Sequence, residues 1–283
     1  MNINPFGTLY IVATPIGNIQ DMSFRAIETL KNVAEIAAED TRHSAPLLQH
    51  YQITTPMQSL HDHNERERSD YLLQRIQKGE SIALISDAGT PLISDPGYYL
   101  VMEARKKGIR VEPIPGACAL IAALSASGLP TDRFCFEGFL PAKTKQRLEY
   151  LETLQTESRT MVFYESPHRI LDCLHDLQAV FGNDRLVTMA RELTKMHEII
   201  RSGTLSELIP WVANDSNQRR GEIVIVVAGA PKALSQKDEV SIDNLLKILL
   251  KELPLKQAVE IASKISGSRK NELYQRALVF KTE

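Results

Sequence analysis

Residues 81–97 read Ser-Ile-Ala-Leu-Ile-Ser-Asp-Ala-Gly-Thr-Pro-Leu-Ile-Ser-Asp-Pro-Gly, an apolar run followed at once by a loop rich in turn-forming residues. The run Ser81–Ser86 predicts a buried strand, because short continuous apolar runs bounded by turn formers are typical of parallel sheets. The two glycines and two prolines of residues 87–97 predict an extended backbone that an adenosine or an amino-acid group can approach closely. An ordinary tight loop is the alternative interpretation.

The segments on either side of this stretch repeat the alternation of strand and helix. Further strands are expected at residues 8–13, 35–38 and 110–114, and helices from about Ser23 onward and at 65–77, 98–107 and 117–127. Such alternation predicts βαβ units and a largely parallel sheet. Because ligands bind beyond the carboxyl ends of such strands, the loops 14–18, 39–43 and 87–97 are expected to border a binding site.

A second α/β domain is expected after a break near residues 128–132. Its strands are predicted at 133–139, 160–164, 186–190 and 222–228, and a helix at 143–156. Ser166 and Pro167 are predicted to begin another helix, as N-cap and first helical residue. After a polar linker at 231–238 only helices are expected. The predicted fold class is therefore α/β, with α/β domains at residues 1–130 and 131–233 and a C-terminal helical domain at 234–283.

The composition excludes several classes of protein. With 43% hydrophobic and 24% charged residues, the chain of 283 residues is typical of globular proteins. Its 33 basic and 35 acidic residues give a net charge of −2, so an RNA partner requires a local basic surface. Three cysteines without a Cys-x-x-Cys pair predict no disulfide framework. No secretory signal or membrane-spanning run is seen, so a cytoplasmic location without a membrane partner is expected.

Several common catalytic motifs are missing from the sequence. No G-x-G-x-x-G follows the first strand and no Walker lysine loop is present. This argues against a dinucleotide-binding domain, against the methyltransferase architecture with a glycine-rich first turn, and against NTP-driven chemistry. A lone His-x-His at residues 61–63 lacks a third ligand at suitable spacing, so no metal is expected.

Two polar segments of the second domain, residues 164–169 and 191–195, each follow a predicted buried strand. Their side chains, among them Glu165, His168 and Arg191, are therefore expected to converge at one sheet edge. Exposed helix starts carry similar residues, so the pattern alone leaves both interpretations open.

Eight segments together resemble the tetrapyrrole-methylase superfamily of S-adenosylmethionine-dependent enzymes, and within it the branch that methylates ribose 2′-oxygens of small-subunit ribosomal RNA. They are Ala13-Thr-Pro-Ile-Gly-Asn18, Ala38-Glu-Asp-Thr-Arg-His43, residues 86–97, Ile114-Pro-Gly116, Gly138-Phe-Leu-Pro141, Phe163-Tyr-Glu-Ser-Pro-His-Arg169, Arg191-Glu-Leu-Thr-Lys195 and Gly221-Glu-Ile-Val. The resemblance implies two α/β domains with S-adenosylmethionine in the cleft between them, and a homodimer. The cofactor-binding residues that it implies are Pro15, Ala88, Gly89, Thr90, Ile93, Cys118, Ala119, Leu193 and Ala230. Thr90 stands where the family's loop has an acid.

The implied reaction is transfer of a methyl group from a sulfonium to a 2′-oxygen, and the implied substrate is a cytidine of 16S ribosomal RNA in the assembled 30S subunit. A ribose hydroxyl is a poor nucleophile at neutral pH, so a base or hydrogen-bond acceptor within reach is expected. The candidates for this role are Asp40 first, then Glu165 and His168. The candidate phosphate contacts near them are Arg42, Arg191 and Lys195.

The C-terminal segment predicts helices up to Leu253, from Lys256 to Ile265 and from Arg269, a spacing that resembles a helix-turn-helix. Residues 235–283 hold 9 basic and 7 acidic side chains, against 24 and 28 in residues 1–234. The predicted RNA contacts of this segment are Lys256, Lys264, Arg269, Lys270 and Arg276. The apolar residues expected to pack together are Ala258, Ile261, Ala262, Ile265, Leu273, Ala277 and Leu278. A dimerisation or capping hairpin is the alternative.

Two other functions remain open at this point. One is a small-molecule methylase of tetrapyrrole or corrin precursors, which the basic C-terminal segment and residues 164–169 disfavour. The other is a non-catalytic RNA-binding factor of ribosome assembly that has kept only the fold.

Overall fold

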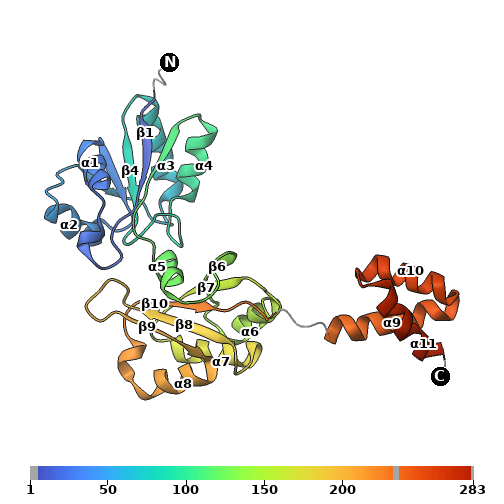
Figure 1. The fold of residues 1–283 in the computed structure, drawn as a ribbon. Coiled ribbons are helices and arrows are strands. Elements are labelled where there is room, and N and C mark those ends of the chain that lie inside the picture. The colour runs from blue at the N-terminus through green and yellow to red at the C-terminus, as the bar shows by residue number, and fades with distance from the viewer. Residues whose placement is uncertain (1–5, 232–235, 282–283) are drawn as a thin grey trace. The chain divides into compact units, whose positions relative to one another are not determined.

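The computed structural model describes residues 6–231 and 236–281, and in the second range the side chains of residues 242–280 (Figure 1). Internal contacts divide the chain into two units, Met1–Gly229 and Ala230–Glu283. The larger unit contains two α/β domains, and the smaller one contains helices only. The predicted fold class is confirmed. The expected boundary at 233/234 and half of the expected linker at 231–238 fall on residues 232–235, which lie outside the described residues. Residues 236–238, expected in the linker, instead belong to the first turn of helix α9 (Gln236–Glu252).

The first sheet has five parallel strands in the order β3-β2-β4-β1-β5. The strands are β1 (Thr8–Val12), β2 (Glu35–Ala38), β3 (Met57–Ser59), β4 (Ile82–Ile85) and β5 (Arg110–Ile114). Helices α1 (Phe24–Asn32) and α2 (Thr41–His50) bury one face, and α3 (Glu65–Gln77) and α4 (Tyr98–Lys106) bury the other. The alternation along β4 shows this directly, because Ile82 and Leu84 contact the second helix pair while Ala83 and Ile85 contact the first.

Local sequence accounts for most of these boundaries. The Ser23 hydroxyl accepts a hydrogen bond from the Ala26 N–H at 3.1 Å, which confirms Ser23 as the N-cap of α1. Helix α2 and strand β3 were not expected. Helix α2 carries Pro46 and a polar first turn, and β3 is only three residues long, so neither shows a periodic apolar pattern.

The second sheet has the strand order β6-β7-β10-β8-β9, and only β6 and β7 run parallel. The strands are β6 (Phe134–Phe139), β7 (Thr160–Glu165), β8 (Leu186–Arg191), β9 (Ile199–Thr204) and β10 (Ile223–Val227). Helices α6 (Thr144–Thr153), α7 (Ile170–Phe181) and α8 (Leu205–Asn214) cover one face. Two short 3₁₀ turns, η1 (Ile19–Asp21) and η2 (Ser216–Arg219), complete the larger unit.

The predicted start of α7 at Ser166 and Pro167 is wrong. Residues 166–169 form a turn, closed by the Arg169 N–H donating to the Ser166 carbonyl at 3.1 Å, and the helix begins at Ile170. The Ser166 carbonyl, which would accept the first i+4 hydrogen bond of a helix capped at Ser166, accepts from Arg169 at i+3 instead. Arg169 is therefore the N-cap, and its carbonyl accepts from the Cys173 N–H at 2.8 Å.

Helix α5 (Ala119–Ala126) packs on the other face of the second sheet. Its Leu120, Ala123 and Leu124 are buried against Val162, Ala190, Val224 and Val226 of the sheet. The small side chains of this helix allow its backbone to approach the strands closely. Since α5 follows the last strand of the first sheet, this contact holds the two α/β domains together (Figure 1).

The smaller unit is a three-helix bundle of α9 (Gln236–Glu252), α10 (Leu255–Ser266) and α11 (Lys270–Lys281). Its buried core contains Leu246, Val259, Ala262, Leu273 and Ala277. Ala258 is also buried, but the expectation that Ile261, Ile265 and Leu278 pack in this core is wrong, since Ile265 is 66% exposed and the other two about 40%. Three helices bury only the stripe of α10 that holds residues 258, 259 and 262, and the row of residues 261 and 265 lies beside that stripe.

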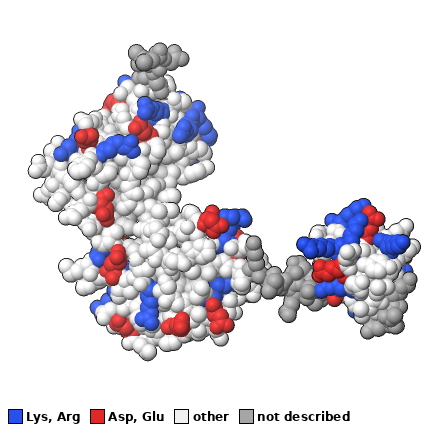
Figure 2. All heavy atoms as spheres, in the orientation of Figure 1, with Lys and Arg blue, Asp and Glu red and all other residues white. Residues whose placement is uncertain are grey.

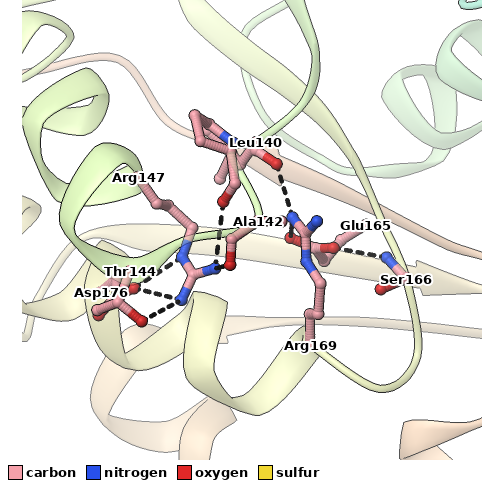
Figure 3. Close-up of polar contacts among 9 residues, drawn as sticks. Leu140, Ala142, Thr144, Arg147, Glu165, Ser166, Arg169 and Asp176 are labelled. Atoms are coloured by element: carbon pink, nitrogen blue, oxygen red, sulfur yellow. Dashed lines mark hydrogen bonds and ion pairs between the residues drawn. The ribbon is translucent and has the colours of Figure 1, made fainter.

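A buried ion pair joins α6 to α7. Arg147 is 2% exposed and donates to Asp176 Oδ2 from Nε at 2.7 Å, and to the carbonyls of Pro141 and Ala142 (Figure 3). Because the guanidinium also bonds the loop that precedes α6, this pair fixes the connection from β6 to α6.

Removing one partner of this pair should destabilise the protein strongly. We expect Asp176→Ala to lower the free energy of unfolding by about 3–5 kcal/mol, because the Arg147 charge is left buried without a counter-ion. The matched control is Glu149→Ala, which removes an exposed ion pair with Lys145 on the same helix and should change stability by less than about 1 kcal/mol. Urea denaturation measures both, and equal losses would contradict the prediction.

Candidate active site

A cleft of about 370 Å³ lies in the larger unit, where loops of the first sheet face the edge of the second. Its lining residues come from both α/β domains: Ile16, Ala88, Gly89, Thr90, Ile93, Ser94, Asp95, Cys118, Ala119, Phe139, Tyr164, Glu165, Ser166, Pro167, Ala190, Leu193, Gly221, Glu222, Ile223 and Val224. The first-sheet residues follow the carboxyl ends of β1, β4 and β5, which is where open α/β sheets bind ligands.

Backbone hydrogen bonds tie the first-sheet loops to one another. Thr14 and Gly89 exchange two backbone hydrogen bonds, at 2.9 and 3.1 Å, and so join the loops after β1 and β4. The Thr90 hydroxyl donates to the Ala117 carbonyl at 3.0 Å and joins the loop after β5. Thr90, which replaces the family's acid, is thus engaged in fixing this wall of the cleft.

Two loops that contribute to the cleft wall contain strained backbone. Leu92 and Ser94 have φ values of 72° and 70°, and Glu192 and Thr194 have φ values of 53° and 66°. Residues other than glycine seldom occupy this left-handed region of backbone conformation, because it costs them of order 1 kcal/mol or more each. Each strained pair brackets an apolar side chain, Ile93 or Leu193, that lines the cleft.

The loop of Glu192 and Thr194 also makes a polar contact with the loop after β1, between the two α/β domains. The Thr194 hydroxyl accepts a hydrogen bond from the Asn18 N–H at 3.0 Å. A Cβ placed on Gly17 would come within 2.4 Å of the Lys195 side chain, so only glycine allows this close approach. Lys195 itself pairs with Glu192 at 2.9 Å and Glu222 at 3.2 Å beside the cleft.

Most of the expected cofactor residues lie together. Seven of them line the cleft: Ala88, Gly89, Thr90, Ile93, Cys118, Ala119 and Leu193. Pro15 and Ala230 are not among the lining residues, although Ile16 next to Pro15 is. Residues that the sequence reasoning did not single out include Asp95, Phe139, Tyr164 and the run 221–224. These residues lie within the eight segments that carry the family resemblance. The sequence did not show which of their side chains are buried or point into the cleft.

The cleft suits the cofactor that the resemblance implies. Its wall combines accessible backbone at Ala88 and Gly89 with apolar side chains such as Ile93, Leu193 and Val224. Such a lining accepts an adenine ring and the methyl and methylene groups of a sulfonium centre, and the volume is in the range of small-molecule sites. No cluster of three metal-ligating side chains occurs in the described part of the chain.

Glu165 lines the cleft, but its carboxylate is engaged (Figure 3). One oxygen accepts from the Ser166 N–H at 2.7 Å, and the other accepts from Arg169 Nη2 at 3.0 Å. His168 lies in the same turn, is exposed and is not among the lining residues. The structure therefore brings Glu165 to the cleft and leaves His168 outside its wall.

Asp40 lies at the N-terminus of α2 and does not line the cleft. Its carboxylate accepts from the Arg42 backbone N–H at 2.8 Å and pairs with the Arg42 guanidinium at 2.7 Å. The hydrogen bonds from Arg42 lower the pKa of Asp40 well below its usual range. A carboxylate held in this way is a weak proton acceptor.

Arg191 is buried at the end of β8 and bonds backbone carbonyls. Its guanidinium donates to the carbonyl of His197 at 3.0 Å and to that of Arg220 at 3.4 Å. It thereby ties the loop containing Leu193 to the segment that precedes β10. Arg42, in contrast, is exposed and available to solvent apart from its Asp40 contact.

Asp95 is the half-buried carboxylate of the loop after β4. Burial, together with the nearby negative charges of Glu39 and Asp87, raises its pKa to about 6, against a smaller lowering by a hydrogen bond from Ser86. This environment disfavours the ionised form of Asp95, because the nearby charged groups that affect its pKa are carboxylates. None of the described groups that affect this pKa is a cation.

Residues 8–209 match the family described as tetrapyrrole (corrin/porphyrin) methylases, and residues 236–281 match the RsmI C-terminal HTH domain. The ribosomal RNA small subunit methyltransferase I of Pseudomonas aeruginosa is 57% identical over 276 residues, 96% of this chain and 97% of that protein. The protein of the same name from Escherichia coli O157:H7 is 53% identical over 97% of this chain and 96% of its own length.

Solved structures share the fold at low sequence identity. A crystal structure of diphthine synthase has a TM-score of 0.60 at 16% identity and covers 78% of this chain and 90% of its own. Uroporphyrin-III C-methyl transferase from Thermus thermophilus, complexed with S-adenyl homocysteine, has a TM-score of 0.54 at 18% identity, with coverages of 78% and 97%. No described helix is long and apolar enough to cross a membrane.

The environment of Asp95 predicts a pH-dependent gain of stability in the Asp95→Asn protein. The folded-state pKa of about 6 exceeds the ordinary value of 3.8, so the wild type loses stability as the pH rises from about 4 through 6, where the folded carboxyl must ionise. We expect Asp95→Asn to have a higher melting temperature than the wild type at pH 7.5 and the same one near pH 4. A difference in melting temperature that stayed constant between pH 4 and pH 7.5 would contradict a raised pKa of Asp95.

Proposed function

The chain belongs to the tetrapyrrole methylase family, within the ribosomal RNA small subunit methyltransferase I group, and we propose that it methylates a ribose 2′-oxygen of 16S ribosomal RNA with S-adenosylmethionine. The observation that carries this is the 57% identity to a methyltransferase of that name over nearly the full length of both chains. The match of residues 236–281 to the RsmI C-terminal HTH domain supports the same group.

The proposed cofactor site is the cleft. When bound, S-adenosylmethionine supplies an electrophilic methyl group on a sulfonium. The residues proposed to hold it are Ala88, Gly89, Thr90, Ile93, Cys118, Ala119 and Leu193, with Pro15 and Ala230 as the outer members of the set. The rigid loops of this wall orient the cofactor and exclude water, which is the main contribution expected from the protein in such a transfer.

The finer assignments extend this proposal. The substrate nucleotide is a cytidine, the substrate is the assembled 30S subunit and the enzyme works as a homodimer in the cytoplasm, where ribosomes are assembled. Asp40, Glu165 and His168 are retained as candidate proton acceptors, and the contacts of Asp40 and Glu165 with arginines count against both. Arg42, Arg191 and Lys195 are retained as candidate RNA contacts, of which Arg42 is the exposed one.

Mapping of ribose methylation tests the proposal directly. Small subunits from cells with and without the gene should differ at one ribose of 16S ribosomal RNA, and the purified protein with S-adenosylmethionine should restore the mark. A cytidine at that position supports the finer assignment. Unchanged ribosomal RNA with altered tetrapyrrole intermediates would instead indicate a small-molecule methylase, and binding without methylation would indicate an assembly factor.

An exposed aromatic ring at the cleft offers a stacking surface for the target base. Phe139 is 58% exposed, lines the cleft and contacts the Tyr164 ring edge-on at 5.6 Å. Enzymes that modify a nucleotide commonly stack its base on aromatic side chains. Phe139 is therefore proposed to hold the base while the ribose faces the cofactor.

Removal of this ring should weaken the substrate complex. We expect Phe139→Ala to raise the KM for small subunits roughly 5- to 100-fold, as the loss of one base–aromatic stack predicts, and Phe139→Trp to stay near the wild type. The affinity for S-adenosylmethionine serves as a second readout and should change little. Phe134→Ala, on the same strand and outside the cleft lining, is the control, and an equal rise in KM there would count against stacking.

The helical unit is proposed to contact RNA phosphate. Lys and Arg side chains gather on its visible face with acidic side chains among them (Figure 2). Two of the proposed contacts, Lys264 and Lys270, pair with Glu260 at 3.3 and 3.6 Å, and Arg276 lies 3.8 Å from Asp243. Lys256 and Arg269 are exposed, and no ion pair to either is found among the described residues.

Lys256 and Arg269 should therefore contribute most to binding. We expect the double variant Lys256→Ala, Arg269→Ala to bind small subunits more weakly and with a shallower salt dependence, by about one unit of slope per lost phosphate contact. Lys106→Ala, which removes an exposed ion-paired lysine of the larger unit, is the control. Unchanged subunit affinity together with a loss of dimer would support the dimerisation role instead.

A further inference from the structure

Three carboxylates line the cleft, and two of them are engaged. Glu165 has no exposed side-chain surface and accepts from the Ser166 N–H and from Arg169. Glu222 is largely exposed and pairs with Lys195 at 3.2 Å. Asp95 is the third, and no ion pair to it is found in the described part of the chain. It is the cleft carboxylate that is free to accept a proton.

The groups around Asp95 favour the uptake of a proton. Glu39 and Asp87 face it from the carboxyl ends of the first sheet, the Ser86 hydroxyl bonds it from the end of β4, and the Tyr164 phenol faces it from the second sheet. Both charged neighbours are acidic, so a proton on Asp95 relieves repulsion among three carboxylates. A positively charged group bound in the cleft is stabilised by the same field.

We propose that Asp95 accepts the proton of the ribose 2′-hydroxyl during methyl transfer. This inference rests on the proposed function and names the proton acceptor that the function requires. The proposals for cofactor binding and RNA binding are unchanged by it. Asp95 is a different residue from the three proton acceptors suggested by the sequence, which are Asp40, Glu165 and His168.

The step balances in atoms and charge. The 2′-oxygen forms a bond to the methyl carbon while the sulfur–carbon bond breaks, and the electron pair of that bond stays on sulfur. The hydroxyl proton passes to an Asp95 carboxylate oxygen. A sulfonium and a carboxylate thus become a neutral thioether and a neutral carboxylic acid, so the low-dielectric cleft loses two opposite charges in one step. Asp95 then releases the proton through its solvent-exposed side.

The proton affinity of Asp95 suits this role better than that of Asp40. A general base works best when its pKa lies near the working pH. The pKa of Asp95 is raised to about 6, whereas Arg42 lowers that of Asp40. At neutral pH Asp95 is therefore ionised and ready, and it is a stronger proton acceptor than an ordinary carboxylate.

The test is single-turnover methylation of small subunits purified from cells that lack the gene, with S-adenosylmethionine labelled in its methyl group. We expect Asp95→Asn to slow the transfer roughly 10²–10⁴-fold, the usual range for loss of a general base. Titration calorimetry with S-adenosyl homocysteine should show an affinity within about twofold of the wild type, which also reports an intact fold. Asp95→Glu, which keeps the carboxylate, should recover part of the rate.

The pH profile separates a proton acceptor from a structural residue. The wild-type rate should fall about tenfold per pH unit below pH 6 and level off above it, and the Asp95→Asn rate should lack this limb. Asp87→Asn is the matched variant: it removes a charge that raises the pKa of Asp95, so the limb should move to lower pH.

Three outcomes would overturn the proposal. A wild-type single-turnover rate in Asp95→Asn would exclude Asp95 as the acceptor. If saturating S-adenosylmethionine restored the rate of Asp95→Asn, and this variant bound S-adenosyl homocysteine more weakly, Asp95 would instead be assigned to binding the cofactor's ammonium group. If the wild-type protein itself transferred no methyl group to small subunits, the proposed function would fail together with this step, a result distinct from the other two.

Discussion

The packing of α5 on the second sheet is the contact on which the rest of the structure depends. Leu120, Ala123 and Leu124 bury one face of that helix against β7, β8 and β10. The helix directly follows the first sheet, so this burial sets the distance between the two α/β domains. The same apolar cluster includes Ile16, Ile93 and Leu193 of the cleft wall. The cleft is thus an open continuation of the core between the domains.

Two loops with strained backbone accompany this arrangement. Leu92 and Ser94 on one side, and Glu192 and Thr194 on the other, occupy the left-handed region without being glycine. The hydrogen bond from Asn18 to Thr194 and the two carbonyl contacts of Arg191 hold the second loop in place. The fold therefore expends stability to present Ile93 and Leu193 to the ligand, as is common at functional sites.

The fold was largely predictable because continuous apolar runs such as Ile82–Ile85 permit one interpretation, whereas the missed α2 lacks such a pattern. Ser166 and Pro167 were correct residue types for a helix start, but residues 166–169 form a turn in which the Ser166 carbonyl accepts from Arg169, and the helix begins at Ile170. Seven of the residues proposed to hold the cofactor line the cleft because the motifs that named them lie on its loops. Asp95 was part of such a motif, yet its raised pKa arises first from burial and then from the charges of Glu39 and Asp87. Spacing along the chain reveals neither the burial nor the approach of Glu39. Asp40 looked reactive in sequence and is neutralised by a neighbour two residues away.

Strand β10 lies at the centre of the second sheet although it is the last strand of that sheet in the chain. Ile223 pairs with both Glu165 and Arg191, so the β6–β7 and β8–β9 pairs have no common neighbour until β10 is inserted between them. During synthesis the cleft therefore stays incomplete until residue 227 has left the ribosome. This long-range closure sets an order of events in biogenesis, because Ile223 and Val224 of β10 are part of the cleft wall and a ligand can contact the complete wall only after β10 is inserted.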